Sequence, residues 1–351
     1  MQKRIKWGQL GAAITLSLAL MTACGTNEEE VNENNQANDN DEVTNETENN
    51  NDEIENAADE ENEAANEEVT GGEFPITLTD KVDREVTIDE EPETIVSLLP
   101  SNTEIVFELG AGDRLIGVSD FCNYPPEAED IQNVGGQDMD PELILSLEPD
   151  MALVQRYHYE NHSEILDQYE QSGIDVLVIE GGESFDEAYD TIKMLGSATG
   201  TSSRADEIVV EMKDALAEIE EKAEEISEED RKTVWVEISP SPNIFTAGQG
   251  TFMHEMLEVI QATNAAEDQE GWVSLTEEEI VMLSPDVIIT THGVAEDPID
   301  EVVSRDGWSD IPAVQDERIH DVDNDTVIRP GPRLIEGVET LAKLVYPEIF
   351  E

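Results

Sequence analysis

Several polar and aromatic side chains stand directly after short apolar runs that are predicted strands. Arg156, Tyr157 and His158 follow one such run, and His292 follows another. Parallel strands end at a common edge of a sheet, and α/β proteins bind their ligands at that edge. An Arg offers a planar fork for a carboxylate, a phosphate or an amide oxygen, and aromatic rings offer flat apolar area. The pattern predicts a ligand site, with a structural ion pair as the alternative for each Arg.

Arg329 and Trp272 extend this set of candidate binding residues. Arg329 stands in a segment near the end of the chain, where Arg333 is expected to begin the last helix and to be packed. Cations are scarce in this sequence, with 18 Lys and Arg against 85 Asp and Glu, so these arginines are conspicuous. Trp272 follows Gly271 in a predicted loop and is expected either to line a cleft or to pack in the core.

The histidines allow a second chemistry, the binding of a zinc or manganese ion. His158 and His162 are four residues apart and would share one face of a helix, as zinc ligands do. The sequence has no His-rich loop to support them, so a metal site is the weaker alternative. Loss of thermal stability on adding a chelator would favour it, because a bound metal contributes folding free energy.

The sequence carries no motif that predicts catalysis. It contains no Gly-x-Ser-x-Gly elbow, no phosphate-binding glycine loop and no His-Glu-x-x-His helix. Cys122 has no His tied to it by any motif, and a small buried thiol is its more common fate. We therefore expect a protein that is not an enzyme, with no catalytic residues and no cofactor.

The elements that must position these residues alternate between strands and helices. Residues 93–99 form a predicted buried strand, and a helix follows up to Gly110. The phrase ELILSLEPDMALV at 142–154 returns as EEIVMLSPDVIIT at 278–290, each an amphipathic helix stopped before Pro and followed by an apolar strand. Helix–strand alternation predicts parallel sheets, and two copies predict two lobes with related folds.

A long helix is predicted between the two copies. Ile208, Met212 and Leu216 belong to a series of apolar residues at spacings of three and four, as on one face of a helix over residues 201–229. A hydroxyl side chain at 201–203 can cap its start. The predicted fold class is α/β, with two Rossmann-like lobes joined by a single long rigid helix; a surface helix within one domain is the alternative.

The N-terminus has the features of an export signal. A basic stretch at 3–6 precedes an apolar run, 10–21, which is too short to span a bilayer because about 20 apolar residues are needed. The run ends in MTACG, which resembles the lipobox of bacterial lipoproteins, with Met21 where Leu is preferred. The resemblance implies that Cys24 is the lipidated first residue of the mature protein; an ordinary signal peptide is the alternative.

A strongly acidic segment follows Cys24. Residues 28–68 hold 18 Asp and Glu but no Lys, Arg or aromatic residue, a composition that predicts a disordered, extended tether. After this segment 67 acidic and 15 basic residues remain, so the formal net charge of the folded part is near −52. Such a surface excludes nucleic-acid binding, since it has no basic patch for phosphates. It also suggests a salt-tolerant source, because salt screens the self-repulsion.

Five ordered segments resemble the periplasmic-binding family for cobalamin and ferric siderophores. They are SLLPSNTEI (97–105), GVSDFCNYPPEA (117–128), VGG (134–136), TAGQGTF (246–252) and RPGPR (329–333). The similarity runs from about residue 94 to residue 350. It implies two α/β lobes bridged by a rigid helix, a ligand bound between them, and delivery to the permease of an ABC importer. A lipid anchor at Cys24 on a Gram-positive cell membrane agrees with that family.

The cobalamin branch of the family is favoured by the loop after the second strand. NYPP at 123–126 is similar to the Asp-Tyr-Pro-Pro of that branch, which implicates Tyr124, and Phe121 matches an aromatic that faces the corrin. Cobalamin binders often carry a Trp after the position of Val134, whereas this chain has Gly135. A ferric siderophore or haem therefore stays open as the second ligand class.

The resemblance also implies how the protein would dock on its importer. Family members present one acidic knob per lobe to basic pockets of the permease, and Glu142 aligns with the first knob. Glu258, or Glu255 one helical turn earlier, aligns with the second. We expect a monomer with the divisions 1–23 (signal peptide), 24–72 (tether), 73–200 (first lobe), 201–230 (inter-lobe helix) and 231–351 (second lobe).

Overall fold

The computed structural model describes residues 74–292 and 297–350. The predicted signal peptide, Cys24 and the acidic tether lie outside these residues, so those predictions are untouched by the structure. The described residues all belong to one compact unit. Within the described ranges no helix has the length and apolar composition needed to cross a membrane.

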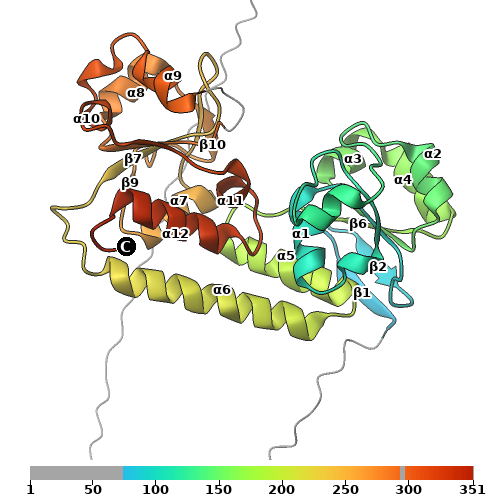
Figure 1. Ribbon diagram of the computed structural model, residues 1–351. Coiled ribbons are helices and arrows are strands. Elements are labelled where there is room, and N and C mark those ends of the chain that lie inside the picture. Colours follow the sequence, from blue (N-terminus) through green and yellow to red (C-terminus); the bar gives the residue numbers. More distant parts are fainter. Residues whose placement is uncertain (1–73, 293–296, 351) are drawn as a thin grey trace, which may run out of the picture. The chain divides into compact units, whose positions relative to one another are not determined.

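The N-terminal lobe, blue to green in Figure 1, is built on a parallel sheet with the strand order β4-β3-β5-β6. Its strands are β3 (Ile95–Ser97), β4 (Leu115–Val118), β5 (Met151–Val154) and β6 (Asp175–Val178). Every residue of β3 and β5 is buried, as expected for a parallel sheet covered on both faces. The helices of this lobe are α1 (Pro100–Glu108), α2 (Pro141–Leu147), α3 (Arg156–Asn161), α4 (Ser163–Gln171) and α5 (Phe185–Ala198).

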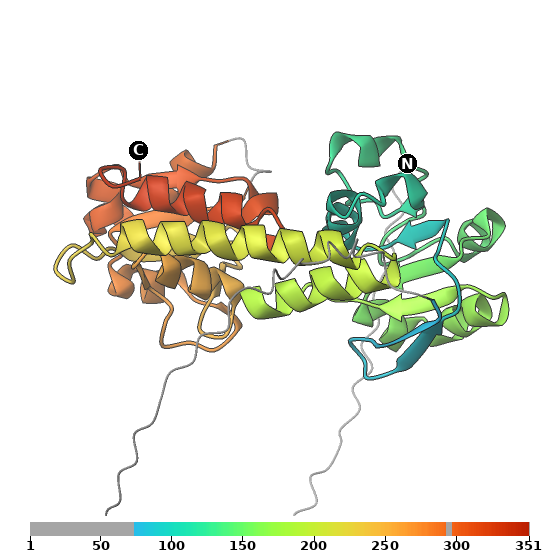
Figure 2. The ribbon, with the colours of Figure 1, turned by 90° about the horizontal axis from the view of Figure 1, so that it is seen from below.

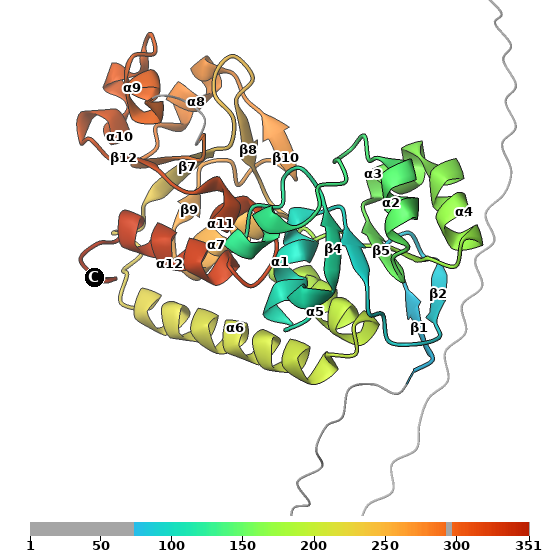
Figure 3. The same cartoon turned by 45° about the vertical axis from the view of Figure 1, so that its right-hand side comes forward.

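An antiparallel hairpin precedes this sheet and packs beside it (Figure 3). It consists of β1 (Ile76–Thr79) and β2 (Glu85–Ile88). The carboxylate of Asp80 organises the turn, since it accepts the backbone N–H groups of Val82 and Arg84 at 3.0 Å each. The N–H of Lys81 donates to the carbonyl of Val178 at 3.0 Å, which attaches the turn to the end of β6.

The C-terminal lobe repeats this plan with the parallel order β12-β11-β7-β9. Its strands are β7 (Thr233–Glu237), β9 (Thr263–Asn264), β11 (Val287–Thr290) and β12 (Ile319–Asp321), and an antiparallel pair is formed by β8 (Phe245–Ala247) and β10 (Trp272–Ser274). Its helices are α7 (Phe252–Val259), α8 (Glu277–Leu283), α9 (Pro298–Val303), α10 (Pro312–Gln315), α11 (Asn324–Ile328) and α12 (Leu334–Val345). Short 3-10 turns occupy Gly112–Arg114, Pro126–Asp130 and Trp308–Asp310. The predicted fold class of two parallel α/β lobes is confirmed.

The repeated phrase forms the same unit in both lobes. Helices α2 and α8 each begin at a side-chain cap, from Asp140 and Thr276, and each is followed by a buried parallel strand. Both helices end on a non-glycine residue in the left-handed region, Glu148 at φ 49° and Ser284 at φ 51°. This C-cap turns the chain sharply before the Pro that follows, which cannot continue the helix.

The long helix α6 (Ser202–Ala223) lies between the two lobes along the chain (Figure 1). It packs against α5 of the first lobe and against α7 and α12 of the second (Figure 2). Its buried face belongs to one hydrophobic cluster that includes core residues of both lobes, so the core is continuous through α6. The helix ends at Ala223 instead of Glu229, and Thr201 occupies the N-cap position without a side-chain bond to the helix.

Candidate functional site

A cavity of about 430 Å³ opens at the carboxyl ends of β3, β5 and β6 and reaches Pro330 of the C-terminal lobe. This is the edge where the sequence predicted a site, and the volume is within the range of small-molecule pockets. Most of its lining comes from the loops that follow the three strands. The lining residues are Lys81, Leu99, Ser101, Gln155, Arg156, Glu180, Gly181, Gly182, Glu183, Glu187 and Pro330.

Arg156 is the predicted binding residue that the structure places in this cavity. Its Nε donates to Glu180 Oε2 at 3.2 Å, and its Nη2 donates to the carbonyl of Lys81. The two side chains of this ion pair are 43% and 41% exposed. An exposed pair of this kind contributes little to stability, so the guanidinium can exchange partners at low cost.

The loop after β6 brings the two lobes into contact beside the cavity. A Cβ at Gly181 would lie 1.9 Å from Cγ of Pro330, so only glycine fits against that proline. Gly182 has φ +90°, a backbone conformation that favours glycine. Glu183 then accepts a hydrogen bond from Nε1 of Trp272 at 2.7 Å, which joins this loop to β10.

Tyr124 and Arg329, both predicted to bind ligand, take part in a buried ion cluster between the lobes. Glu104 of α1 accepts hydrogen bonds from Arg329 at 2.8 Å and from Arg333 at 2.7 and 2.9 Å. The guanidinium of Arg333 lies 3.8 Å over the ring centroid of Tyr124. Burial opposes the charge of Arg333, but its hydrogen bonds to Glu104 raise its pKa above the ordinary value.

Asn123 completes this cluster. Its amide oxygen accepts from Arg329 at 2.7 Å, and its amide nitrogen donates to Asp325 at 2.9 Å. Arg329 also pairs with Asp325 at 2.8 Å. Arg329 thus makes the ion pairs that were the alternative to ligand binding, its carboxylate partners come from both lobes, and its contact with ligand stays a prediction.

The remaining aromatic candidates differ in exposure and in position. Phe121 is 64% exposed, Tyr157 is 37% exposed and Trp272 is 36% exposed. The ring of Trp272 packs edge-on against Phe252 at 5.5 Å, in addition to its bond to Glu183. Trp272 is therefore held near the cavity, whereas Phe121 offers a free apolar face.

His158 is buried, and both of its ring nitrogens contact backbone groups. Its Nε2 lies 3.0 Å from the carbonyl of Gly136, and its Nδ1 accepts the N–H of Gln155 at 3.2 Å. Burial lowers its pKa below the ordinary histidine value. The ring of His162 is 6.2 Å away, but within the described ranges no carboxylate or thiol joins the pair to complete a set of metal ligands.

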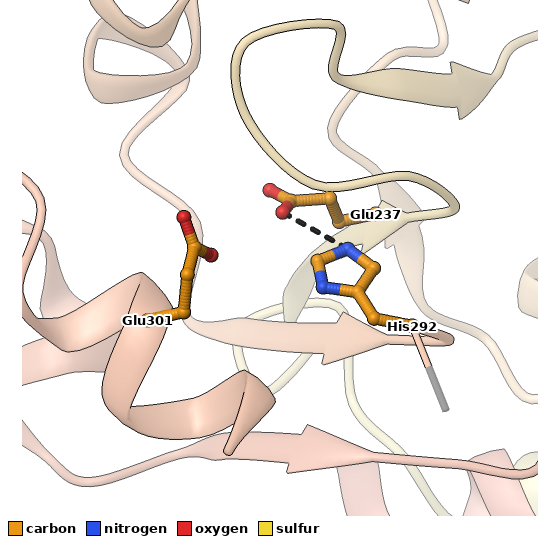
Figure 4. A group of neighbouring side chains, drawn as sticks. All are labelled: Glu237, His292 and Glu301. Carbon is orange, nitrogen blue, oxygen red and sulfur yellow. Dashed lines mark ion pairs between the residues drawn. The ribbon is translucent and has the colours of Figure 1, made fainter. Parts of the chain in front are cut away.

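His292 lies in the other lobe, beside Glu237 and Glu301 (Figure 4). Its Nε2 is 3.1 Å from Glu237 Oε1, although neither ring nitrogen makes a well-aligned hydrogen bond. Ligand atoms of these three residues lie within 4.8 Å of one another, which is the spacing of a metal site.

Arg305 already supplies the positive charge of this group. It donates to both oxygens of Glu237, at 2.8 and 2.5 Å, and to Oε1 of Glu301 at 3.1 Å. Burial by itself would raise the pKa of Glu237, but Arg305 outweighs burial and holds that pKa below its usual range. A divalent cation would have to lie beside this guanidinium, so we interpret the group as a buried ion-pair network.

The three acidic residues predicted to dock on a permease differ in availability. Glu142 is exposed on α2, and Glu258 is exposed on α7 with His254 Nε2 3.5 Å from it. Glu255 is half-buried and accepts the backbone N–H of Phe185 at 2.7 Å. Burial raises the pKa of Glu255. Glu258 is thus the freer of the two candidates on the second lobe.

Several cavity residues were not singled out from the sequence. Gly181, Gly182 and Glu183 follow the apolar run of β6 in the same way that Arg156 follows β5, so the same signal applied to them. Lys81 and Pro330 carry no such signal. They reach the cavity through contacts with residues far away in the chain.

Comparisons with known proteins agree with this arrangement. A family model described as periplasmic binding protein matches residues 95–326. An uncharacterized ABC transporter substrate-binding lipoprotein of Bacillus subtilis, YvrC, is 46% identical over 278 residues, which cover 79% of this chain and 88% of that protein. A cobalamin-binding protein of Halobacterium salinarum is 29% identical over 282 residues, or 77% of this chain and 73% of that protein.

A solved structure shows the same fold. It is that of a possible iron-binding (periplasmic solute-binding) protein from Staphylococcus epidermidis. The two chains are 33% identical with a TM-score of 0.65, and the similarity covers 73% of this chain and all of the other.

Proposed function

The chain belongs to the periplasmic binding protein family, and from this premise we propose that it is the substrate-binding lipoprotein of an ABC importer and captures a corrinoid between its lobes. The family resemblance carried by the five sequence motifs is thereby confirmed. The observation that carries the binding role is the cavity, which joins the strand ends of one lobe to Pro330 of the other. A ligand held there would stabilise the contact between the lobes.

Support for a corrinoid comes from the relatives and from two aromatic side chains that are at least partly exposed. A relative of 29% identity is named a cobalamin-binding protein. Phe121 presents a largely exposed ring, and Trp272 is hydrogen-bonded to Glu183, which lines the cavity. A flat macrocycle gains large contact area from such rings.

A ferric siderophore or haem is the second candidate ligand. The specific observation in its favour is the 33% identity to the structure of a possible iron-binding protein. Gly135 and Gly136 also stand where the cobalamin branch often has a Trp, as the sequence indicated.

A thermal-shift screen separates these ligands. We expect cyanocobalamin or dicyanocobinamide to raise the melting temperature, since a ligand at 100 times its dissociation constant adds about 2.7 kcal/mol. Haem and ferric siderophores serve as the competing probes under identical conditions. A clear shift with a ferric siderophore and none with either corrinoid would assign the site to the second candidate.

Delivery is proposed to use Glu142 and Glu258, with Cys24 as the membrane anchor on the extracytoplasmic side. Both glutamates are exposed, one on each lobe, and a basic pocket on a permease would complement them. The chain offers a matched control, because Glu278 occupies the position in α8 that Glu142 occupies in α2. Charge reversal at Glu142 should reduce ligand-stimulated ATP hydrolysis by the reconstituted permease, whereas reversal at Glu278 should not. Equal effects would argue against a specific knob.

A further inference from the structure

Lys81 is a cavity residue whose backbone is fixed from three sides. Its N–H donates to Val178 at the end of β6, and its carbonyl accepts from the guanidinium of Arg156. Asp80 holds the rest of the turn through the N–H groups of Val82 and Arg84. The base of the Lys81 side chain is therefore anchored at the cavity wall, and its flexible four-carbon stem can carry the ammonium to a ligand.

Lys81 also differs from the other charged groups of the cavity in its partners. Arg156 is paired with Glu180, whereas the Lys81 ammonium takes part in none of the ion pairs among the described residues. The other two cavity carboxylates each accept one hydrogen bond: Glu183 from Trp272 at 2.7 Å, and Glu187 from the N–H of residue 183 at 2.6 Å. The cavity lining thus includes one lysine whose ammonium makes none of the ion pairs among the described residues, and several carboxylate oxygens with spare acceptor capacity.

We propose that Lys81 binds the phosphodiester of the ligand and thereby selects complete corrinoids over those that lack the nucleotide arm. This inference rests on the proposed corrinoid function. A complete corrinoid carries one phosphodiester and several primary amides, which matches one free ammonium and a set of acceptor carboxylates. A ligand with two or more anionic groups would place the second one among Glu180, Glu183 and Glu187, where the other cation of the lining, Arg156, is already paired with Glu180.

Isothermal titration of the full-length protein with two corrinoids tests the assignment. Cyanocobalamin has the phosphodiester, and dicyanocobinamide lacks the nucleotide arm. Lys81→Met should weaken cyanocobalamin binding about tenfold, the size expected for one hydrogen bond between charged groups, and leave dicyanocobinamide within about twofold. Lys81→Arg should retain most of the affinity for cyanocobalamin.

Lys193→Met is the matched control, since Lys193 pairs with Asp206 at 3.7 Å on an exposed surface and does not line the cavity. This variant should bind both corrinoids as the wild type does. Added NaCl should weaken cyanocobalamin binding by the wild type more than by Lys81→Met, because screening acts on the pair that the variant lacks.

The possible failures are distinguishable. If the wild type binds both corrinoids and Lys81→Met weakens both equally or neither, the role of Lys81 is wrong and the proposed function stands. If the wild type binds neither corrinoid, the proposed function fails and this inference falls with it. Because the two ligands are compared on the same variant, a folding defect cannot imitate selective loss of one of them.

Discussion

The two lobes repeat one helix–strand unit but use its strand ends differently. In the N-terminal lobe the ends of β3, β5 and β6 line a cavity, where the Arg156–Glu180 pair is about two-fifths exposed. In the C-terminal lobe a network fills the ends of β7 and β11, with the Glu237 side chain fully buried and that of Arg305 4% exposed. Repetition of a fold therefore places polar residues at equivalent points, and local burial decides which of them a ligand can reach.

The largest effect should come from breaking the buried network. Glu237→Gln removes the charge that faces Arg305 and leaves a buried guanidinium with only Glu301, itself partly exposed, as its carboxylate partner. We expect a loss of about 3 kcal/mol in the free energy of unfolding, as for other buried pairs that lose one partner. Urea denaturation monitored by circular dichroism measures it.

Glu180→Gln in the other lobe is the matched control. It removes the same charge from an exposed pair, so the free energy of unfolding should change by less than about 1 kcal/mol. If Glu237→Gln and Glu180→Gln lose similar amounts of the free energy of unfolding, burial of the ion pair does not explain the difference between the lobes.

The same contrast predicts a difference in acid stability. Because Arg305 outweighs burial and holds the pKa of Glu237 below its usual range, Glu237 binds a proton more readily in the unfolded chain than in the folded one. Its contribution is complete above the ordinary glutamate pKa and is lost as pH falls through the lower folded value. We expect Glu237→Gln to flatten the fall of stability with pH in this window, measured by urea titrations at several pH values. An unchanged slope would contradict the lowered pKa.

The sequence predicts features that depend on residues close together in the chain better than features that depend on distant residues. The repeat, its caps and the apolar face of α6 are local patterns, and they gave the two parallel lobes and the helix between them. Arg329 and Glu104 form an ion pair although they are 225 positions apart. No spacing rule in the sequence could therefore predict that Arg329 is paired with a carboxylate.

The cavity lining also contains residues that the sequence could not predict. Arg156 was predicted because it follows its own strand directly, but Lys81 belongs to a hairpin outside the parallel sheet and Pro330 to the opposite lobe. Residues brought in by tertiary approach carry no local signal. Glu142 and Glu258 are visible on the surface, and their docking role stays a prediction because exposure does not identify a partner.

A smaller effect is expected from the contact that joins the two lobes at the cavity. Gly181→Ala would place a methyl group 1.9 Å from Cγ of Pro330, so the loop and the proline must separate. Overpacking of this kind costs about 1–2 kcal/mol, which should appear as weaker ligand binding because the lobes cannot approach fully. Isothermal titration measures it, and Pro330→Ala in the same background should restore part of the affinity. If the double variant binds no better, the two residues are not in contact when ligand binds.

The smallest predicted effect is that of salt on stability. Salt should act differently on the exposed Arg156–Glu180 pair and on the buried Arg305–Glu237 pair. With a formal net charge of −67, the chain repels itself, and NaCl screens that repulsion. We expect the wild-type melting temperature to rise by about 2–4 °C between low and molar salt, equivalent to about 1 kcal/mol for a chain of this size. The cost of Glu180→Gln should vanish in molar NaCl, whereas the cost of Glu237→Gln should persist, because ions in solution do not reach a side chain with no exposed surface. Differential scanning fluorimetry of the three proteins at both salt concentrations measures these differences, and a Glu237→Gln penalty that fades with salt would mean that the network is open to solvent.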